Sequence, residues 1–102
     1  MSNKLLFSLS FNRIKYMIKI WGKIYSKERL IKSKTTKVDT KSTTFFDMLA
    51  HLCHSLNIPT PVLLDKHVYD FNLFNICTFK ADDFIEDIMF DSFVVQYVGD
   101  DF

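Results

Sequence analysis

Residues 18–25 read IKIWGKIY, and this stretch decides the fold because its side chains alternate strictly in character. The aliphatic side, which includes the glycine, is Ile18, Ile20, Gly22 and Ile24; the basic and aromatic side is Lys19, Trp21, Lys23 and Tyr25. A period of two with β-branched residues on one side is typical of a half-buried strand. The segment therefore predicts a strand that turns its isoleucines toward a core and its other side chains outward.

The residues that follow predict the second strand of a hairpin. Residues 26–29 are polar and suit a turn, and residues 30–38 read LIKSKTTKV. Lysines are common on exposed edge strands, where they discourage pairing with other chains. We therefore expect residues 30–38 to return beside the first strand and to form an edge of the sheet.

A helix is predicted over residues 45–56 because apolar residues recur at helical spacing. The apolar stripe is Phe45, Leu49, Leu52 and Leu56, with Cys53 at its edge. Thr44 precedes Asp47 by three residues, a weaker form of the capping box that satisfies free amides at a helix start. Asn57 and the prolines that follow it end the helix.

The remaining segments complete an α+β chain. Residues 62–64 predict a short interior strand, residues 66–75 a short helix, residues 76–80 a strand, and residues 92–98 a last strand rich in β-branched and aromatic residues. Residues 81–91 are acidic and irregular. We expect a mostly antiparallel sheet of four or five short strands, with the helix over residues 45–56 packed on one face. One domain spans residues 17–98, after an extension over residues 1–16 that is either helical or mobile and before a tail over residues 99–102.

The composition narrows the classes of protein to which the chain can belong. The 102 residues are 48% hydrophobic, enough for one core, and Cys53 and Cys77 form neither a CxxC pair nor a disulfide framework. Reduced thiols of this kind indicate a cytoplasmic protein. Basic residues interrupt the apolar patches of residues 1–21 well before the ~18 apolar residues of a membrane span accumulate. No cleavage site of a signal peptide follows them.

Charge is segregated along the chain. Residues 1–44 contain eleven Lys or Arg and two acidic residues, a balance of +9, whereas residues 45–102 contain ten acidic residues and two Lys, a balance of −8. Such asymmetry concerns partners rather than fold. Three interpretations are open. The two halves neutralise each other within one fold, or the basic half of one copy pairs with the acidic half of another. In the third, a basic surface is left to bind phosphate.

Several segments resemble a known family. They are KIWGKIY at residues 19–25, FFDMLAHLC at 45–53, IPTPVLLDKHVYDF at 58–71 and FKADDFIEDIMFDSFVVQYV at 79–98. Over residues 17–98 the chain resembles a family of small bacterial proteins of low-GC Gram-positive species (Firmicutes) whose function is unknown. The resemblance implies a domain that begins near Met17 and implies no active site.

Motifs for catalysis and cofactor binding are scarce, so the chain leans away from being an enzyme and predicts no cofactor. Phosphate-binding loops and dinucleotide folds need glycines where the backbone approaches phosphate, and the chain has only Gly22 and Gly99. The metal candidate is Asp47, His51 and His54, which share one helix face at spacings of four and three. An ordinary solvated helix face explains the same three residues, and a fourth ligand such as His67 would have to come from elsewhere.

The outward side of the first strand is the strongest candidate site. Lys19, Trp21, Lys23 and Tyr25 alternate basic and aromatic side chains, as on surfaces that bind single-stranded nucleic acid. Lys32, Lys34 and Lys37 on the return strand would enlarge the patch. The alternative is that Trp21 and Tyr25 are covered by residues 1–16 or by a second subunit.

The sequence therefore predicts a small non-enzymatic binding protein that engages a protein partner or itself, as a homodimer. A nucleic-acid-binding module that uses the basic and aromatic strand face is the runner-up. A metal-dependent enzyme is a distant third. No membrane contact is expected.

Overall fold

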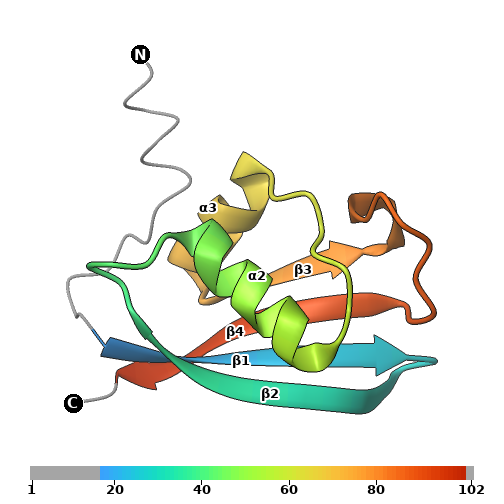
Figure 1. Cartoon of the computed structure of the whole chain (residues 1–102), viewed down its shortest axis with the longest axis horizontal. Coiled ribbons are helices and arrows are strands. Elements are labelled where there is room, and N and C mark those ends of the chain that lie inside the picture. Colours follow the sequence, from blue (N-terminus) through green and yellow to red (C-terminus); the bar gives the residue numbers. More distant parts are fainter. Residues whose placement is uncertain (1–16, 101–102) are drawn as a thin grey trace.

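Residues 17–100, which the computed structural model describes, form a sheet with helices on one side of it (Figure 1). The elements in chain order are β1 (Met17–Ser26), β2 (Arg29–Asp39), α2 (Phe45–Leu56), α3 (Asp65–Phe74), β3 (Ile76–Lys80), the 3-10 helix η1 (Ala81–Asp83) and β4 (Ser92–Asp100). The strand order is β2-β1-β4-β3, and every neighbouring pair is antiparallel. The predicted α+β class and the antiparallel sheet are confirmed.

The isoleucines of β1 build the floor of the core. Ile18, Ile20 and Ile24 are buried under the helices, together with Phe79 and Phe93 of β3 and β4. α2 contributes the predicted stripe with Met48 added to it, and its Phe45 meets Phe71 of α3 edge to face, with ring centroids 5.1 Å apart. The side of β1 that was predicted to face the core does so.

Gly22 lets α2 approach the sheet. A Cβ at this position would lie 3.1 Å from Cε1 of Phe93 and 3.4 Å from the side-chain carbons of Leu52 and Leu56. Any side chain here would have to displace packed core atoms. The glycine in the middle of this strand therefore marks a close approach of helix and sheet.

Caps fix both ends of α2. The Thr44 hydroxyl accepts a hydrogen bond from Asp47 N, and Asn57 ends the helix in the left-handed conformation, with a φ of 58°. Lys32 Nζ donates a hydrogen bond to the Leu56 carbonyl at 2.7 Å, which places a positive charge at the negative end of the helix. The cap predicted at Thr44 is confirmed, and Lys32 ties the end of α2 to β2.

The hairpin turns on Lys27 and Glu28, whose φ angles are 51° and 66°. Tight two-residue hairpins use this left-handed conformation, which usually selects glycine or asparagine. The Asp91 carboxylate accepts a hydrogen bond from Lys27 N at 2.6 Å and so holds the turn from outside. Asp91 N in turn donates to the Tyr25 carbonyl at 2.9 Å.

Two expectations are wrong in detail. Residues 62–64 are not a strand but an extended link into α3, where Val62 and Leu64 are exposed. One reason is that Pro59 and Pro61 precede them and cannot donate to a ladder. The predicted tail begins too early, because β4 continues through Asp100 beside the long strand β1. The extension over residues 1–16 lies outside the described residues.

Candidate binding surface

The side of the sheet opposite the helices is uncovered by any described element, and we call it the open face (Figure 1). Cross-strand register assigns its members, since directly opposed residues point to the same side. They are Met17, Lys19, Trp21, Lys23 and Tyr25 of β1; Leu30, Ser33, Thr35, Lys37 and Asp39 of β2; Ser92, Val94, Gln96 and Gly99 of β4; and Ile76, Thr78 and Lys80 of β3. The basic and aromatic side of β1 thus lies near the middle of a four-stranded surface.

Lys23 is only 8% exposed although it lies on this face. Its Nζ donates a hydrogen bond to Gln96 Oε1 at 2.6 Å. The same nitrogen lies over the Trp21 ring, 4.3 Å from the centroid, and 6.0 Å from the centroid of Tyr25. A cation–aromatic contact contributes about 0.5–2 kcal/mol, depending on how dry it is. The ammonium group is therefore engaged by its own sheet.

Trp21 and Tyr25 are both half-buried, so each ring keeps part of its surface in contact with solvent. Trp21 lies between Thr35 of β2 and Gln96 of β4, which supply a hydroxyl and an amide beside the ring. Rings of this kind present a flat apolar surface with polar groups at its border, an arrangement that suits a planar partner.

The exposed charge of the open face is positive. Lys19 and Lys37 are direct cross-strand partners at one end of β1, and Lys80 lies at the far edge on β3. Asp39 is the one acidic residue that the register places on this side of the sheet. It lies at the border of the open face, opposite Met17 where β2 ends.

Two of the predicted patch residues lie elsewhere. Lys32 and Lys34 pair with Ile24 and Gly22, so they belong to the side of the sheet that carries the helices. Alternation along a strand already separates them from Lys37, and the hairpin register decides which of the two groups reaches the open face. Of the three lysines expected to enlarge the patch, only Lys37 does so.

The structure does not assemble the predicted metal site. Asp47, His51 and His54 are exposed on α2. Within residues 17–100, no group of three or more His, Cys, Asp or Glu side chains is placed so that it could hold a metal ion. These three residues therefore lie on an ordinary solvated helix face.

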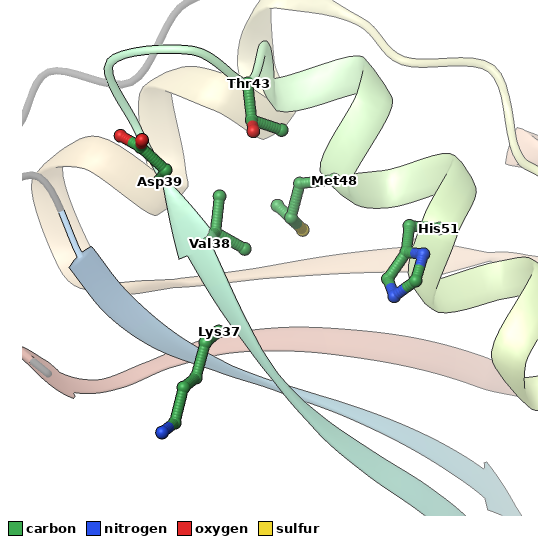
Figure 2. Close-up of a pocket in the computed structure, with 6 residues that line it drawn as sticks. All are labelled: Lys37, Val38, Asp39, Thr43, Met48 and His51. Carbon is green, nitrogen blue, oxygen red and sulfur yellow. The ribbon is translucent and has the colours of Figure 1, made fainter.

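A hollow of about 280 Å³ lies between the end of β2, the link after it and α2 (Figure 2). Its lining residues are Lys37, Val38, Asp39, Thr43, Met48 and His51. In Figure 2, Asp39 and Thr43 lie at one end and His51 at the other, and the Lys37 side chain points away from them. Asp39 Oδ1 already accepts a hydrogen bond from Lys41 N. No set of polar groups converges here as a binding or catalytic site would need.

His67 is a buried histidine, 1% exposed at the start of α3. Its Nδ1 accepts a hydrogen bond from Leu64 N at 3.0 Å, so the neutral ring carries its proton on Nε2. Nε2 lies 3.5 Å from Asp83 Oδ2, too far for a strong hydrogen bond. Burial lowers the pKa of His67, and the Asp83 carboxylate opposes that shift. The pair joins α3 to η1, and the His67 ring is enclosed within it.

Both thiols are free and buried. Burial raises the pKa of Cys53 to about 12, against a smaller lowering by a hydrogen bond with the Thr60 side chain. Burial likewise raises the pKa of Cys77, and the nearby Asp70 carboxylate adds to the rise. Because the thiolate is the reactive species, neither cysteine is a nucleophile in the folded state near neutral pH.

The acidic residues between β3 and β4 are divided in role. Asp83 Oδ2 accepts a hydrogen bond from Lys80 N, and Asp91 holds the hairpin turn. Asp82, Glu86 and Asp87 are exposed, as is Asp91 itself. The segment also exposes Ile85 and Met89, at 90% and 96%.

The fold defines a two-layer α+β protein. Helices cover one side of its antiparallel sheet, and the open face is the other side. No family model, no curated protein and no solved structure matches the chain. The resemblance to a Firmicutes family therefore stays a prediction. Within residues 17–100, no helix has both the length and the apolar character needed to cross a membrane.

Proposed function

We propose that this protein is a non-enzymatic binding protein and that the open face is its contact surface. The observation that carries the proposal is the gathering of lysines and half-buried aromatic rings on a sheet surface whose one carboxylate by register, Asp39, lies at its border. Aromatic side chains are enriched where proteins bind partners, and a group of lysines attracts partners of negative charge. The buried, protonated thiols and the enclosed His67 support a role without catalysis.

The charge of the open face favours an anionic partner. Lys19, Lys37 and Lys80 would attract a polyanion, and they outnumber the one acidic residue that the register places on the same face, Asp39. The same argument disfavours a second copy docked face to face, because it would bring lysines against lysines. The two free thiols fit a reducing compartment, and we place the protein in the cytoplasm as part of this proposal.

Heparin, a polyanion without base or sequence, is a suitable first probe. We expect the protein to be retained on immobilised heparin, and Lys19→Gln and Lys37→Gln to elute at lower salt. The matched control is Lys34→Gln, which removes the same charge from the helix side of the sheet. Equal elution of all three variants would show that net charge alone governs retention, and the open face would then be rejected as the contact surface.

Self-association is a second candidate function. It is favoured by the apolar side chains exposed at the end of the molecule that holds the hairpin turn. Asp91 contacts Lys27, so the segment between β3 and β4 lies beside the turn (Figure 1). Apolar side chains are exposed on both: Leu30 and Ile31 on the hairpin, Ile85 and Met89 on the segment. Basic residues surround the first pair and acidic residues the second. A two-fold axis at this end would place each patch against its complement on the other copy.

Sedimentation tests this second candidate. We expect wild type to contain a dimer that Ile85→Ser with Met89→Ser dissociates. Leu73→Ser is the control, since Leu73 is exposed on α3. A wild-type monomer at high protein concentration would rule the dimer out.

A further inference from the structure

We infer that the partner of the open face is single-stranded nucleic acid, whose bases stack on Trp21 and Tyr25 and whose phosphates meet Lys19 and Lys37, with Lys23 as a positioning residue. This inference rests on the proposed function, because it names the ligand of the same surface. It assigns different tasks to lysines that look alike in the sequence.

Lys23 does not serve as a phosphate contact. A lysine that reaches for phosphate needs an exposed ammonium group, whereas Nζ of Lys23 is hydrogen-bonded to Gln96 and lies over the Trp21 ring. The Lys23 side chain thus occupies the space between Trp21 and Tyr25, and it restrains both rings. Restrained rings lose less side-chain entropy when a ligand stacks on them.

The rings offer two separate stacking positions. Trp21 and Tyr25 lie four residues apart on one strand, about 13 Å between their Cα atoms at the usual rise. Their rings converge on Lys23, whose Nζ lies 4.3 Å from one ring centroid and 6.0 Å from the other. Lys23 covers the ring surfaces between them, so the surfaces that point away from Lys23 remain for bases. Stacking of this kind tolerates any base, because every base has a flat π face.

Lys19 and Lys37 lie together beyond Trp21, on the side away from Lys23. A strand whose base stacks on the free side of Trp21 would therefore carry its phosphates toward these two lysines. Thr35 lies next to Trp21 and offers a hydroxyl to the edge of that base.

These rings select a single strand over a duplex. In a duplex the base faces are stacked on one another and are hidden from side chains, so only phosphates would reach the open face. An acidic protein segment would satisfy the lysines and would leave the rings without planar partners. The pairing of restrained rings with exposed lysines on one surface favours the single strand.

The binding experiment uses a labelled single-stranded oligonucleotide of about 15 nucleotides, near the upper end of the site sizes of such surfaces. Anisotropy of the label gives affinity, and fluorescence of Trp21, the only tryptophan, reports on the surface itself. We expect saturable binding that quenches Trp21. Trp21→Ala and Tyr25→Ala should each lower affinity by about 5- to 150-fold. Tyr69→Ala removes an exposed tyrosine of α3 and should leave affinity unchanged.

Salt dependence separates the lysines. Each phosphate contact to a single strand contributes about 0.7 to the slope of log affinity against log salt. Lys19→Gln should reduce the slope by about that amount. Lys23→Met should lower affinity at every salt concentration without changing the slope. Melting temperatures followed by circular dichroism identify any variant that fails to fold. Gln96→Leu then tests the positioning role of Lys23, because it removes the hydrogen-bond partner and keeps the lysine.

The outcomes are distinguishable. Failure of every oligonucleotide to bind, with Lys19-dependent retention on heparin preserved, would overturn the inference and leave the proposed function standing. Equal affinity for a duplex of the same length would overturn the stacking argument. Tighter binding of poly-glutamate would point to an acidic protein instead. A reduced salt slope for Lys23→Met would overturn the role assigned to Lys23.

Discussion

His67 links the protonation state of one residue to the stability of the fold. Its ring is enclosed with Nδ1 used as an acceptor from Leu64 N, so a proton added to Nδ1 would break that hydrogen bond. Burial lowers the pKa of His67 in the folded state below the 6.5 of a free side chain, in spite of the attraction of Asp83. The unfolded chain therefore takes up this proton more readily than the folded one.

The free energy of unfolding should consequently fall as pH falls below about 6.5, until the lower pKa of folded His67 is passed. Above that window the contribution of His67 is constant. Urea denaturation at a series of pH values between 5 and 8 measures the slope. His67→Gln should flatten it, and His51→Gln is the control for the loss of a histidine. The same flattening in the control would contradict the assignment to His67.

A side chain at Gly22 would require packed neighbours in the core to move. Gly22→Val would place methyl groups against Phe93, Leu52 and Leu56, and overpacking of this kind lowers the free energy of unfolding by about 1–3 kcal/mol. Gly99→Val is the matched control in the same sheet, because a Cβ at Gly99 meets no atom within 4 Å. Urea denaturation should show a loss for the first variant and little change for the second. Equal stability of both would mean that α2 can move away from β1.

At the scale of elements, the β1–β2 turn has the least favourable local geometry among the described residues. Lys27 and Glu28 adopt positive φ angles without being glycine. A left-handed conformation costs a residue with a side chain roughly 1–2 kcal/mol. Contact with Asp91 compensates for part of this cost, which makes the hairpin dependent on the segment before β4.

Glu28→Gly should therefore raise the free energy of unfolding by about 1 kcal/mol, since glycine adopts this conformation without a Cβ clash. Glu28→Ala keeps the Cβ and removes the carboxylate, so it separates backbone strain from charge. Chemical denaturation should show a gain for the glycine variant alone. A gain of the same size for alanine would assign the effect to the charge.

At the scale of the whole molecule, the sheet and its helices close over the two thiols. Cys53 lies on the buried side of α2, and Cys77 lies on β3 in the same core. Neither can react without an opening that separates the helices from the sheet. Both should therefore be alkylated only through opening of the core, at rates that rise together with urea. Rapid labelling of one thiol by iodoacetamide in the absence of urea would show that its part of the core opens separately.

The sequence by itself determined those features that depend on local interactions. The alternation of residues 18–25 produced β1 with its isoleucines inward, and the apolar spacing after Thr44 produced α2 with the predicted bounds. Such features depend on residues a few positions apart, which the sequence displays directly. The strand predicted for residues 62–64 is wrong because a short apolar run beside prolines carries no periodicity.

The candidate surface depended on contacts between distant segments. The position of β4 between β1 and β3 brings Gln96 beside Lys23, 73 residues away, and turns an apparent phosphate-binding lysine into a buried one. The hairpin register directs Lys32 and Lys34 to the helix side, where Lys32 binds the end of α2. Strand order and register follow from the packing of the whole core, and only the tertiary structure could decide them.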